Sequence, residues 1–246
     1  LTRILFVFDG SQSMYGRWES GAKIDVAQRL MGQMLDSLQG IQEEGNFQLA
    51  LRVYGHQKPV PPQDCSDTRL EVPFSNGNIY KIKRVLKAIN PKGTTPIAGS
   101  LLKASYDFPP CTDCRNIVIL ITDGVEACDG DPCVVSKRLQ QKGIILKPFV
   151  IGIGLDEDFK DSFECVGTYF DAADENTFKN VLGVVISQAL DNTTAQINLL
   201  DNRGKPIETN VPILLYDHTS QKLKKSFVHT LNYKGQPDTL VLDPLV

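Results

Sequence analysis

The stretch Ile4-Leu5-Phe6-Val7-Phe8-Asp9-Gly10-Ser11-Gln12-Ser13-Met14 decides the fold of this 246-residue chain. Its apolar half has the length and composition of a strand that is buried on both faces, as in a parallel sheet. Asp9, Gly10 and Ser11 end the strand because all three residue types favour turns. In an extended loop Asp9, Ser11 and Ser13 would point the same way, and their oxygens are ligands that suit Mg²⁺, Mn²⁺ and Ca²⁺. A loop that only caps the next helix is the alternative.

Strand and helix patterns alternate from this stretch to residue 190. Further strands are predicted at 47–54, 68–74, 116–122, 144–153 and 169–172, and helices at 24–40, 78–89, 95–102, 132–142, 156–165 and 175–190. The first helix is expected to end at Gly40 and to turn Lys23 away from its buried face. Strand 68–74 alternates in polarity and contains Pro73, which indicates an antiparallel edge strand. The pattern predicts a doubly wound α/β fold with a mostly parallel sheet, and the very apolar strand 116–122 is expected at its centre.

The pattern changes beyond residue 192. Short strands separated by polar turns are predicted at 197–200, 211–216, 223–231 and 239–242. We therefore divide the chain into a domain at 1–192 and a small all-β module at 193–246. The module is short for an independent domain and stops abruptly, which is consistent with a truncated module.

Composition excludes several classes of protein. The chain has 26 Lys and Arg against 29 Asp and Glu, a formal net charge of -3, and no basic run, so electrostatic binding of nucleic acid is not expected. No segment reaches the roughly 20 apolar residues of a membrane span. The chain begins within a strand and without Met, which we interpret as a mature or trimmed fragment. Six cysteines favour an oxidising compartment.

Two later stretches carry oxygens to the same edge of the predicted sheet as Asp9. They are 92–97, which contains Thr95, and 117–124, which contains Asp123. Each follows an element that finishes at the carboxyl end of the strands, where open α/β sheets bind ligands. Taken in order, the three stretches resemble the metal-ion-dependent adhesion site of the von Willebrand factor type A domain family, over about residues 3–190. Three ordered motifs are far more specific than one.

The resemblance implies a protein-binding module and not an enzyme. It implies that Asp9, Ser11 and Ser13 ligate a divalent cation, and that Thr95 and Asp123 contribute directly or through water. Mg²⁺ is the favoured ion, with Mn²⁺ or Ca²⁺ as alternatives, and an Asp or Glu of a partner protein would complete the shell. Without the resemblance, Thr95 would be read as a helix N-cap.

Other features extend the resemblance. Tyr15, Thr94 and Glu126 are expected at the rim of the metal site. Three sequence segments together resemble a bacterial branch of the family whose members are secreted or belong to the cell envelope; the segments are 64–67, 128–133 and 169–172. An extracytoplasmic location is therefore expected. The module at 193–246 resembles a small β-sandwich that follows this domain in some bacterial secreted proteins.

The cysteines allow two readings. Zinc binding is suggested by Cys111, Cys114, Cys128 and Cys133, but strand 116–122 should separate the two pairs by roughly 20 Å. Disulfides that tie loops are therefore favoured, with candidates Cys65, Cys111, Cys114, Cys128, Cys133 and Cys165. We place Cys65, Cys128 and Cys133 at the ligand end and the other three at the opposite end, and the connectivity stays open.

Two other functions compete with adhesion. The first is a Mg²⁺-dependent phosphotransferase with Asp9 as nucleophile and Asp123 on the metal. Such enzymes need a second carboxylate two residues after the first, where this chain has Ser11. The second is a purely structural envelope protein, in which partner binding would not respond to metal removal.

Overall fold

The computed structural model describes residues 1–43, 47–111, 114–141, 149–153, 169–172, 174–190, 193–207, 212–216, 221–228, 231 and 239–242. The chain divides into two compact units, Leu1–Ala189 and Leu190–Val246. The helix predicted at 156–165, the first part of the strand predicted at 144–153, and Cys165 lie outside the described residues.

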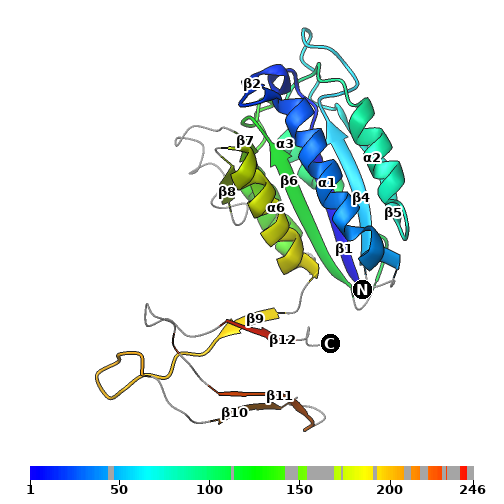
Figure 1. Ribbon diagram of the computed structural model, residues 1–246. Helices are drawn as coiled ribbons and strands as arrows, with labels where there is room; N and C mark the ends of the chain where they lie inside the picture. Colours follow the sequence, from blue (N-terminus) through cyan, green and yellow to red (C-terminus); the bar gives the residue numbers. More distant parts are fainter. Residues whose placement is uncertain are drawn as a thin grey trace. The chain divides into compact units, whose positions relative to one another are not determined.

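The first unit contains a six-stranded sheet with the strand order β5-β4-β1-β6-β7-β8 (Figure 1). Its strands are β1 (Thr2–Asp9), β4 (Phe47–Tyr54), β5 (Thr68–Ser75), β6 (Arg115–Thr122), β7 (Phe149–Ile153) and β8 (Tyr169–Ala172). Every neighbouring pair is parallel except β4 and β5, which are antiparallel at one edge. The predicted doubly wound α/β fold is confirmed, with its antiparallel edge strand and with 116–122 inside the sheet.

Helices cover both faces of this sheet. They are α1 (Lys23–Glu43), α2 (Ile79–Ala88), α3 (Ile97–Ala104), α4 (Pro132–Gln141) and α6 (Glu175–Leu190). In Figure 1, α1, α2 and α6 lie in front of the sheet and α3 lies behind it. The prediction that Gly40 ends the first helix is wrong, because α1 continues to Glu43. One glycine costs a helix only about 1 kcal/mol, which the buried face of α1 offsets.

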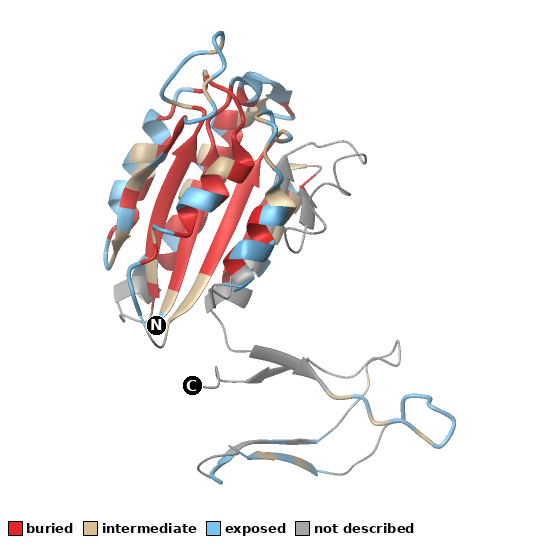
Figure 2. Ribbon diagram, turned by 180° about the vertical axis from the view of Figure 1, so that it is seen from behind, coloured by how far each residue is buried: buried red, intermediate tan, exposed pale blue. Residues whose placement is uncertain are grey.

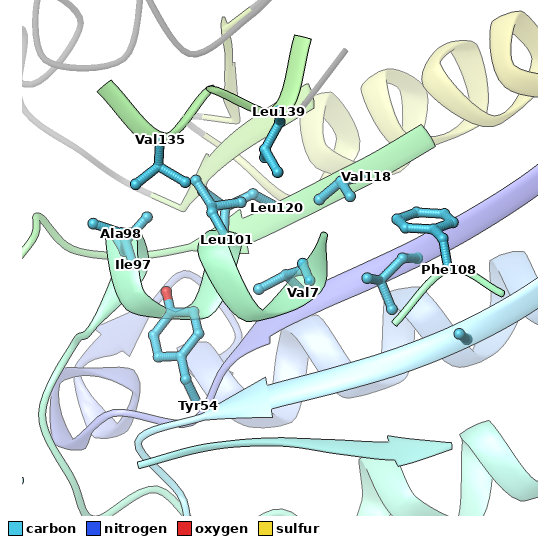
Figure 3. Packing of buried hydrophobic residues seen from close by; sticks show 13 residues of the cluster. Val7, Tyr54, Ile97, Ala98, Leu101, Phe108, Val118, Leu120, Val135 and Leu139 are labelled. Atoms are coloured by element: carbon cyan, nitrogen blue, oxygen red, sulfur yellow. The ribbon is translucent and has the colours of Figure 1, made fainter. Parts of the chain in front are cut away.

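The core lies along β1. Every residue from Ile4 to Phe8 is fully buried, as expected of a central strand covered on both faces (Figure 2). Leu5 and Val7 belong to a cluster with residues of α3 and α4, and this cluster includes Tyr54 at the end of β4 (Figure 3). Because side chains alternate along a strand, Asp9 lies on the same face of β1 as Leu5 and Val7.

A short segment connects β1 to α1. It consists of the 3-10 helix η1 (Gln12–Tyr15) and the antiparallel pair β2 (Arg17–Trp18) and β3 (Gly21–Ala22). Trp18 is buried, and its ring packs edge-on against Phe178 of α6 with 6.0 Å between ring centroids. This contact fixes the segment that follows the serines.

The second unit, described by itself, contains two antiparallel pairs. They are β9 (Thr193–Gln196) with β12 (Thr239–Leu242), and β10 (Pro212–Tyr216) with β11 (Leu223–Val228). The strand predicted at 197–200 is wrong, because the strand that forms here is β9, which ends at Gln196 and pairs with β12. A turn follows at Asp201, whose Oδ1 accepts hydrogen bonds from the backbone N of Arg203 and Lys205. Among the described residues of this unit the strands form only separate pairs, so the expected sandwich is not evident. None of the described helices combines the length and the hydrophobicity that a membrane span requires.

Candidate metal centre

Strand register brings the three predicted loops together. Asp9, the last residue of β1, pairs with Tyr54 of β4, and Phe8 pairs with Ile121 of β6. Because these strands are parallel neighbours, the loops after β1, β4 and β6 leave the same edge of the sheet. Asp9 and Asp123 therefore meet although 114 residues separate them, and the backbone N of Asp123 lies 3.4 Å from Oδ2 of Asp9.

Three glycines allow the loops to touch. The backbone N of Gln12 donates to the carbonyl of Gly93 at 2.9 Å, and the N of Gly93 donates to the carbonyl of Gly55 at 2.8 Å. Gly55 has a φ of +65°, and a Cβ built there would lie 2.4 Å from the carbonyl oxygen of Thr94. A Cβ on Gly10 or Gly93 would also come within 2.8 Å of backbone oxygens. The loops can approach this closely only because these positions lack side chains.

Asp9 is held by donors of the chain itself. Its Oδ1 accepts from the backbone N of Ser11 at 2.7 Å, and its Oδ2 accepts from the Tyr54 hydroxyl at 2.9 Å and the Thr122 hydroxyl at 2.8 Å. Burial, and then the charge of Asp123, raises the pKa of Asp9 to about 6. Burial and the charge of Asp9 raise the pKa of Tyr54 well above its usual value, so the phenol remains a donor.

A continuous row of oxygens runs from the first loop to the end of β6. The hydroxyl oxygens of Ser11 and Ser13 are 2.9 Å apart, and Ser13 donates to Oδ1 of Asp123 at 2.6 Å. Since Ser13 has one hydroxyl proton, Ser11 is the donor in the first bond. Ser11 and Asp123 are buried whereas Ser13 is exposed. The row is therefore open to solvent at Ser13.

Thr95 lies beside this row. A Cβ built on Gly124 would lie 3.8 Å from the Ser13 hydroxyl oxygen and 3.9 Å from the Thr95 hydroxyl oxygen. Both hydroxyls therefore lie next to Gly124. Thr95 is not the N-cap of α3, because Pro96 takes that place and makes no side-chain cap. The carbonyl of Thr95 accepts from the backbone N of Ala127 at 3.0 Å, which ties its loop to the loop after β6.

The three residues expected at the rim lie in different settings. Tyr15 is half exposed and donates its hydroxyl to the side chain of Asn90. Thr94 is buried, and the side-chain amide of Gln63 lies 3.5 Å from its hydroxyl. Glu126 accepts from the backbone N of Ala98 at 2.5 Å and of Cys128 at 2.9 Å, so it caps α3, and burial raises its pKa.

Disulfides tie the neighbouring loops. Cys65, in the loop after β4, is bonded to Cys128, in the loop after β6. Cys111 is bonded to Cys114 just before β6. Cys133 is also disulfide-bonded, and Cys165 lies outside the described residues. The first bond joins the loops that follow β4 and β6, and both loops leave the edge of the sheet that carries Asp9 and Asp123.

The donor set fits a hard divalent cation. Carboxylate and hydroxyl oxygens from three loops gather here, which is the ligand chemistry that Mg²⁺ prefers. Within the ranges that the structure describes, no group of three His, Cys, Asp or Glu side chains forms a metal site. Ion binding would therefore rely on the hydroxyls of Ser11, Ser13 and Thr95 together with Asp123, and with Asp9 directly or through water.

Three residues of the site were not predicted from the sequence. Lys23 was expected on the outer side of α1, but its Nζ lies 3.0 Å from Oδ2 of Asp123. Helical periodicity could not reveal this, because Lys23 begins the helix and reaches toward the preceding turn. Tyr54 and Thr122 end strands that flank β1, so a register alignment of the predicted strand ends would have found both.

Comparison with known proteins defines the family. The sequence pattern of the von Willebrand factor type A domain matches residues 4–183, so the chain belongs to that family. YwmC, an uncharacterized protein of Bacillus subtilis, is 29% identical over 197 residues, which cover 76% of this chain and 82% of YwmC. YwmD, another uncharacterized protein of that bacterium, is 29% identical over 160 residues, 63% of this chain and 69% of YwmD.

Solved structures share the fold. BatB from Bacteroides thetaiotaomicron superposes with a TM-score of 0.60 at 19% identity over 76% of this chain and 98% of BatB. Proximal thread matrix protein 1 from the mussel byssus, with a zinc-occupied MIDAS motif, gives 0.58 at 18% identity over 77% of this chain and 46% of that one. The pilus adhesin SpaC from Lactobacillus rhamnosus GG gives 0.65 at 16% identity, covering 99% of this chain and 38% of SpaC.

Proposed function

We propose that the protein is a divalent-cation-dependent binding module of an extracytoplasmic bacterial protein. The observation that carries this proposal is the row of oxygens from Ser11 through Ser13 to Asp123, open to solvent at Ser13. Mg²⁺ is the favoured ion and Mn²⁺ or Ca²⁺ the alternatives. An Asp or Glu of a partner protein would complete the shell of the bound ion.

The chemistry of the site supports a role in binding. An ion held by neutral hydroxyls and few carboxylates remains electrophilic, so it attracts a carboxylate from outside. Ser13 is the exposed member of the set, and a partner would therefore approach from its side. Asp9 is fully buried, and its carboxylate positions Ser11 by accepting a 2.7 Å hydrogen bond from the backbone N of Ser11.

The relatives support the setting. SpaC is a pilus adhesin, and a further structure with the same fold, at a TM-score of 0.59, is an aerotolerance-related membrane protein from Bacteroides fragilis. The mussel protein, which shares the fold, has a zinc-occupied MIDAS motif, and this supports a divalent cation as the ligand of the present site. The disulfide between Cys65 and Cys128 is typical of proteins outside the reducing cytosol.

The structure disfavours the phosphotransferase alternative. A nucleophilic Asp9 would have to present an unshielded oxygen to a substrate. Instead Asp9 is fully buried, and both of its oxygens accept hydrogen bonds from neighbouring residues. Ser11 also stands where such an enzyme needs its second carboxylate.

The remaining alternative is a structural protein whose partner binding ignores metal. Immobilised protein, exposed to bacterial envelope extract in Mg²⁺, should retain partners that EDTA releases. The Ser13→Ala variant should retain none of these partners, whereas Ser37→Ala should behave as wild type because Ser37 donates to the Met34 carbonyl within α1, away from the row of oxygens. Partners that stay bound in EDTA and to Ser13→Ala would favour the structural alternative.

A further inference from the structure

Lys23 is fixed by the same turn that carries the serines. Its backbone N donates to the carbonyl of Gly16 at 2.9 Å, and the N of Gly16 donates to the carbonyl of Ser13 at 2.7 Å. A Cβ built on Gly16 would lie 3.6 Å from Cε of Lys23, so the lysine stem passes directly over this glycine. The position of the ammonium group is thus coupled to the position of Ser13.

The ammonium group of Lys23 shares a carboxylate with Ser13. Nζ lies 3.0 Å from Oδ2 of Asp123, while the Ser13 hydroxyl is 2.6 Å from Oδ1 of the same group. The Asp123 side chain is fully buried and that of Lys23 is only 18% exposed. Water screens such a pair less than a surface pair, so the positive charge acts strongly on its surroundings.

This arrangement sets the charge of the site. Asp9 and Asp123 supply two negative charges and Lys23 one positive charge. A divalent ion would leave the loaded site with one net positive charge, which a single carboxylate from a partner would neutralise. Without Lys23 the loaded site would already be neutral, and the attraction for an external carboxylate would be weaker.

We propose that Lys23 is a built-in cation of the site that competes with the divalent ion for Asp123 and makes the loaded site selective for an acidic partner. The inference rests on the proposed cation site. Lys23 weakens binding of the ion alone, because two positive groups must share one carboxylate. It strengthens binding of a carboxylate once the ion is present, because the loaded site keeps a positive charge.

Calorimetric titration with Mg²⁺ tests the first half of this proposal. Lys23→Met should bind Mg²⁺ at least tenfold more tightly than wild type, since it removes a neighbouring like charge. Lys23→Arg, which keeps the charge, should stay within about threefold of wild type. Lys83→Met is the matched control, because Lys83 pairs with Asp36 on the outside of α1 and should leave the affinity unchanged.

A second titration tests the half that concerns the partner. Sodium acetate serves as the probe, and NaCl of equal ionic strength is its reference. Acetate should increase the apparent Mg²⁺ affinity of wild type and of Lys23→Arg, and should have a smaller effect on Lys23→Met. In EDTA the melting temperature of Lys23→Met should fall below that of wild type, because Asp123 loses its cationic partner, and Mg²⁺ should restore it.

The outcomes separate the two proposals. Equal Mg²⁺ affinities of wild type and Lys23→Met, with wild type clearly binding, would overturn the role of Lys23 and leave the cation site intact. The same holds for an acetate effect that is identical in both proteins. Absence of Mg²⁺ binding in both proteins would overturn the cation site and the role of Lys23 together.

Discussion

Tyr54 donates its phenolic hydroxyl to Oδ2 of Asp9 across 2.9 Å, and neither side chain is exposed. The two residues end adjacent strands in direct register. The carboxylate behind the serines is therefore positioned by the sheet and not only by its own loop.

Replacement of Tyr54 by Phe should destabilise the protein. The variant loses one hydrogen bond to a buried carboxylate, which is worth about 1.5–3 kcal/mol. Denaturant unfolding in EDTA measures the loss. Tyr80→Phe is the control, because Tyr80 is 75% exposed on α2 and its variant should lie within about 0.5 kcal/mol of wild type. Equal stabilities of the two variants would contradict the role given to Tyr54.

The raised pKa of Asp9 predicts an unusual dependence of stability on pH. An unfolded Asp titrates near 3.9, whereas folded Asp9 titrates at about 6, so between these values the folded state holds a proton that the unfolded state has lost. The contribution of Asp9 to the free energy of unfolding in EDTA should therefore fall as pH rises from about 4 to about 6. Asp9→Asn should lack this contribution, and parallel pH profiles of the two proteins would refute the assignment.

Gly55 should tolerate no side chain. Its φ of +65° is unfavourable for alanine, and the added Cβ would meet the Thr94 carbonyl at 2.4 Å. Gly55→Ala should lose more than about 2 kcal/mol of stability and should bind Mg²⁺ more weakly, because the loops around Ser11 are pushed apart.

Gly77 provides the matched comparison for Gly55. Its φ is +64°, but no atom of the described residues lies within 4 Å of a built Cβ. Gly77→Ala should cost only about 1 kcal/mol, from backbone strain, and should keep the Mg²⁺ affinity of wild type. If both alanine variants lose the same stability and keep the Mg²⁺ affinity of wild type, the close contact at Gly55 has no special role in the site.

The disulfide between Cys65 and Cys128 should contribute much of the stability of the first unit. It closes a sequence separation of 63 residues, and loop entropy predicts a loss of about 4 kcal/mol in a double serine variant. Cys111 and Cys114 are only 3 residues apart, so their double serine variant should lose about 2 kcal/mol. Thermal and denaturant unfolding compare the two, and the reverse order would contradict this account.

The sequence predicted most of the scaffold because its signals are local. The bounds of β4, β8 and α6 agree with the predicted ranges 47–54, 169–172 and 175–190, since each is a contiguous pattern between clear breakers. In the second unit, polar Thr193–Gln196 forms a strand instead of the more apolar residues that follow. Pairing with Thr239–Leu242 decides this outcome, and no local pattern encodes it.

The sequence predicts the oxygen-bearing residues of the candidate site but not the residues that hold them in place. Asp9 ends β1 and Asp123 directly follows β6, so topology alone predicts that they meet, and Ser11 and Ser13 follow Asp9 in the same loop. Gly55 and Lys23 act through contacts with distant loops, and helix periodicity or turn propensity carries no information about such contacts.

Calorimetric titration of the wild-type protein with Mg²⁺, alongside the Ser11→Ala/Ser13→Ala double variant, tests the central claim most directly. The double substitution removes two hydroxyl oxygens and changes no residue of the apolar core cluster, so the variant should fold, and its circular dichroism and melting temperature in EDTA check this. We predict one saturable site in wild type and an affinity at least tenfold lower in the double variant. Absence of binding in wild type, or equal binding by both proteins, would contradict the claim that these loops hold a cation.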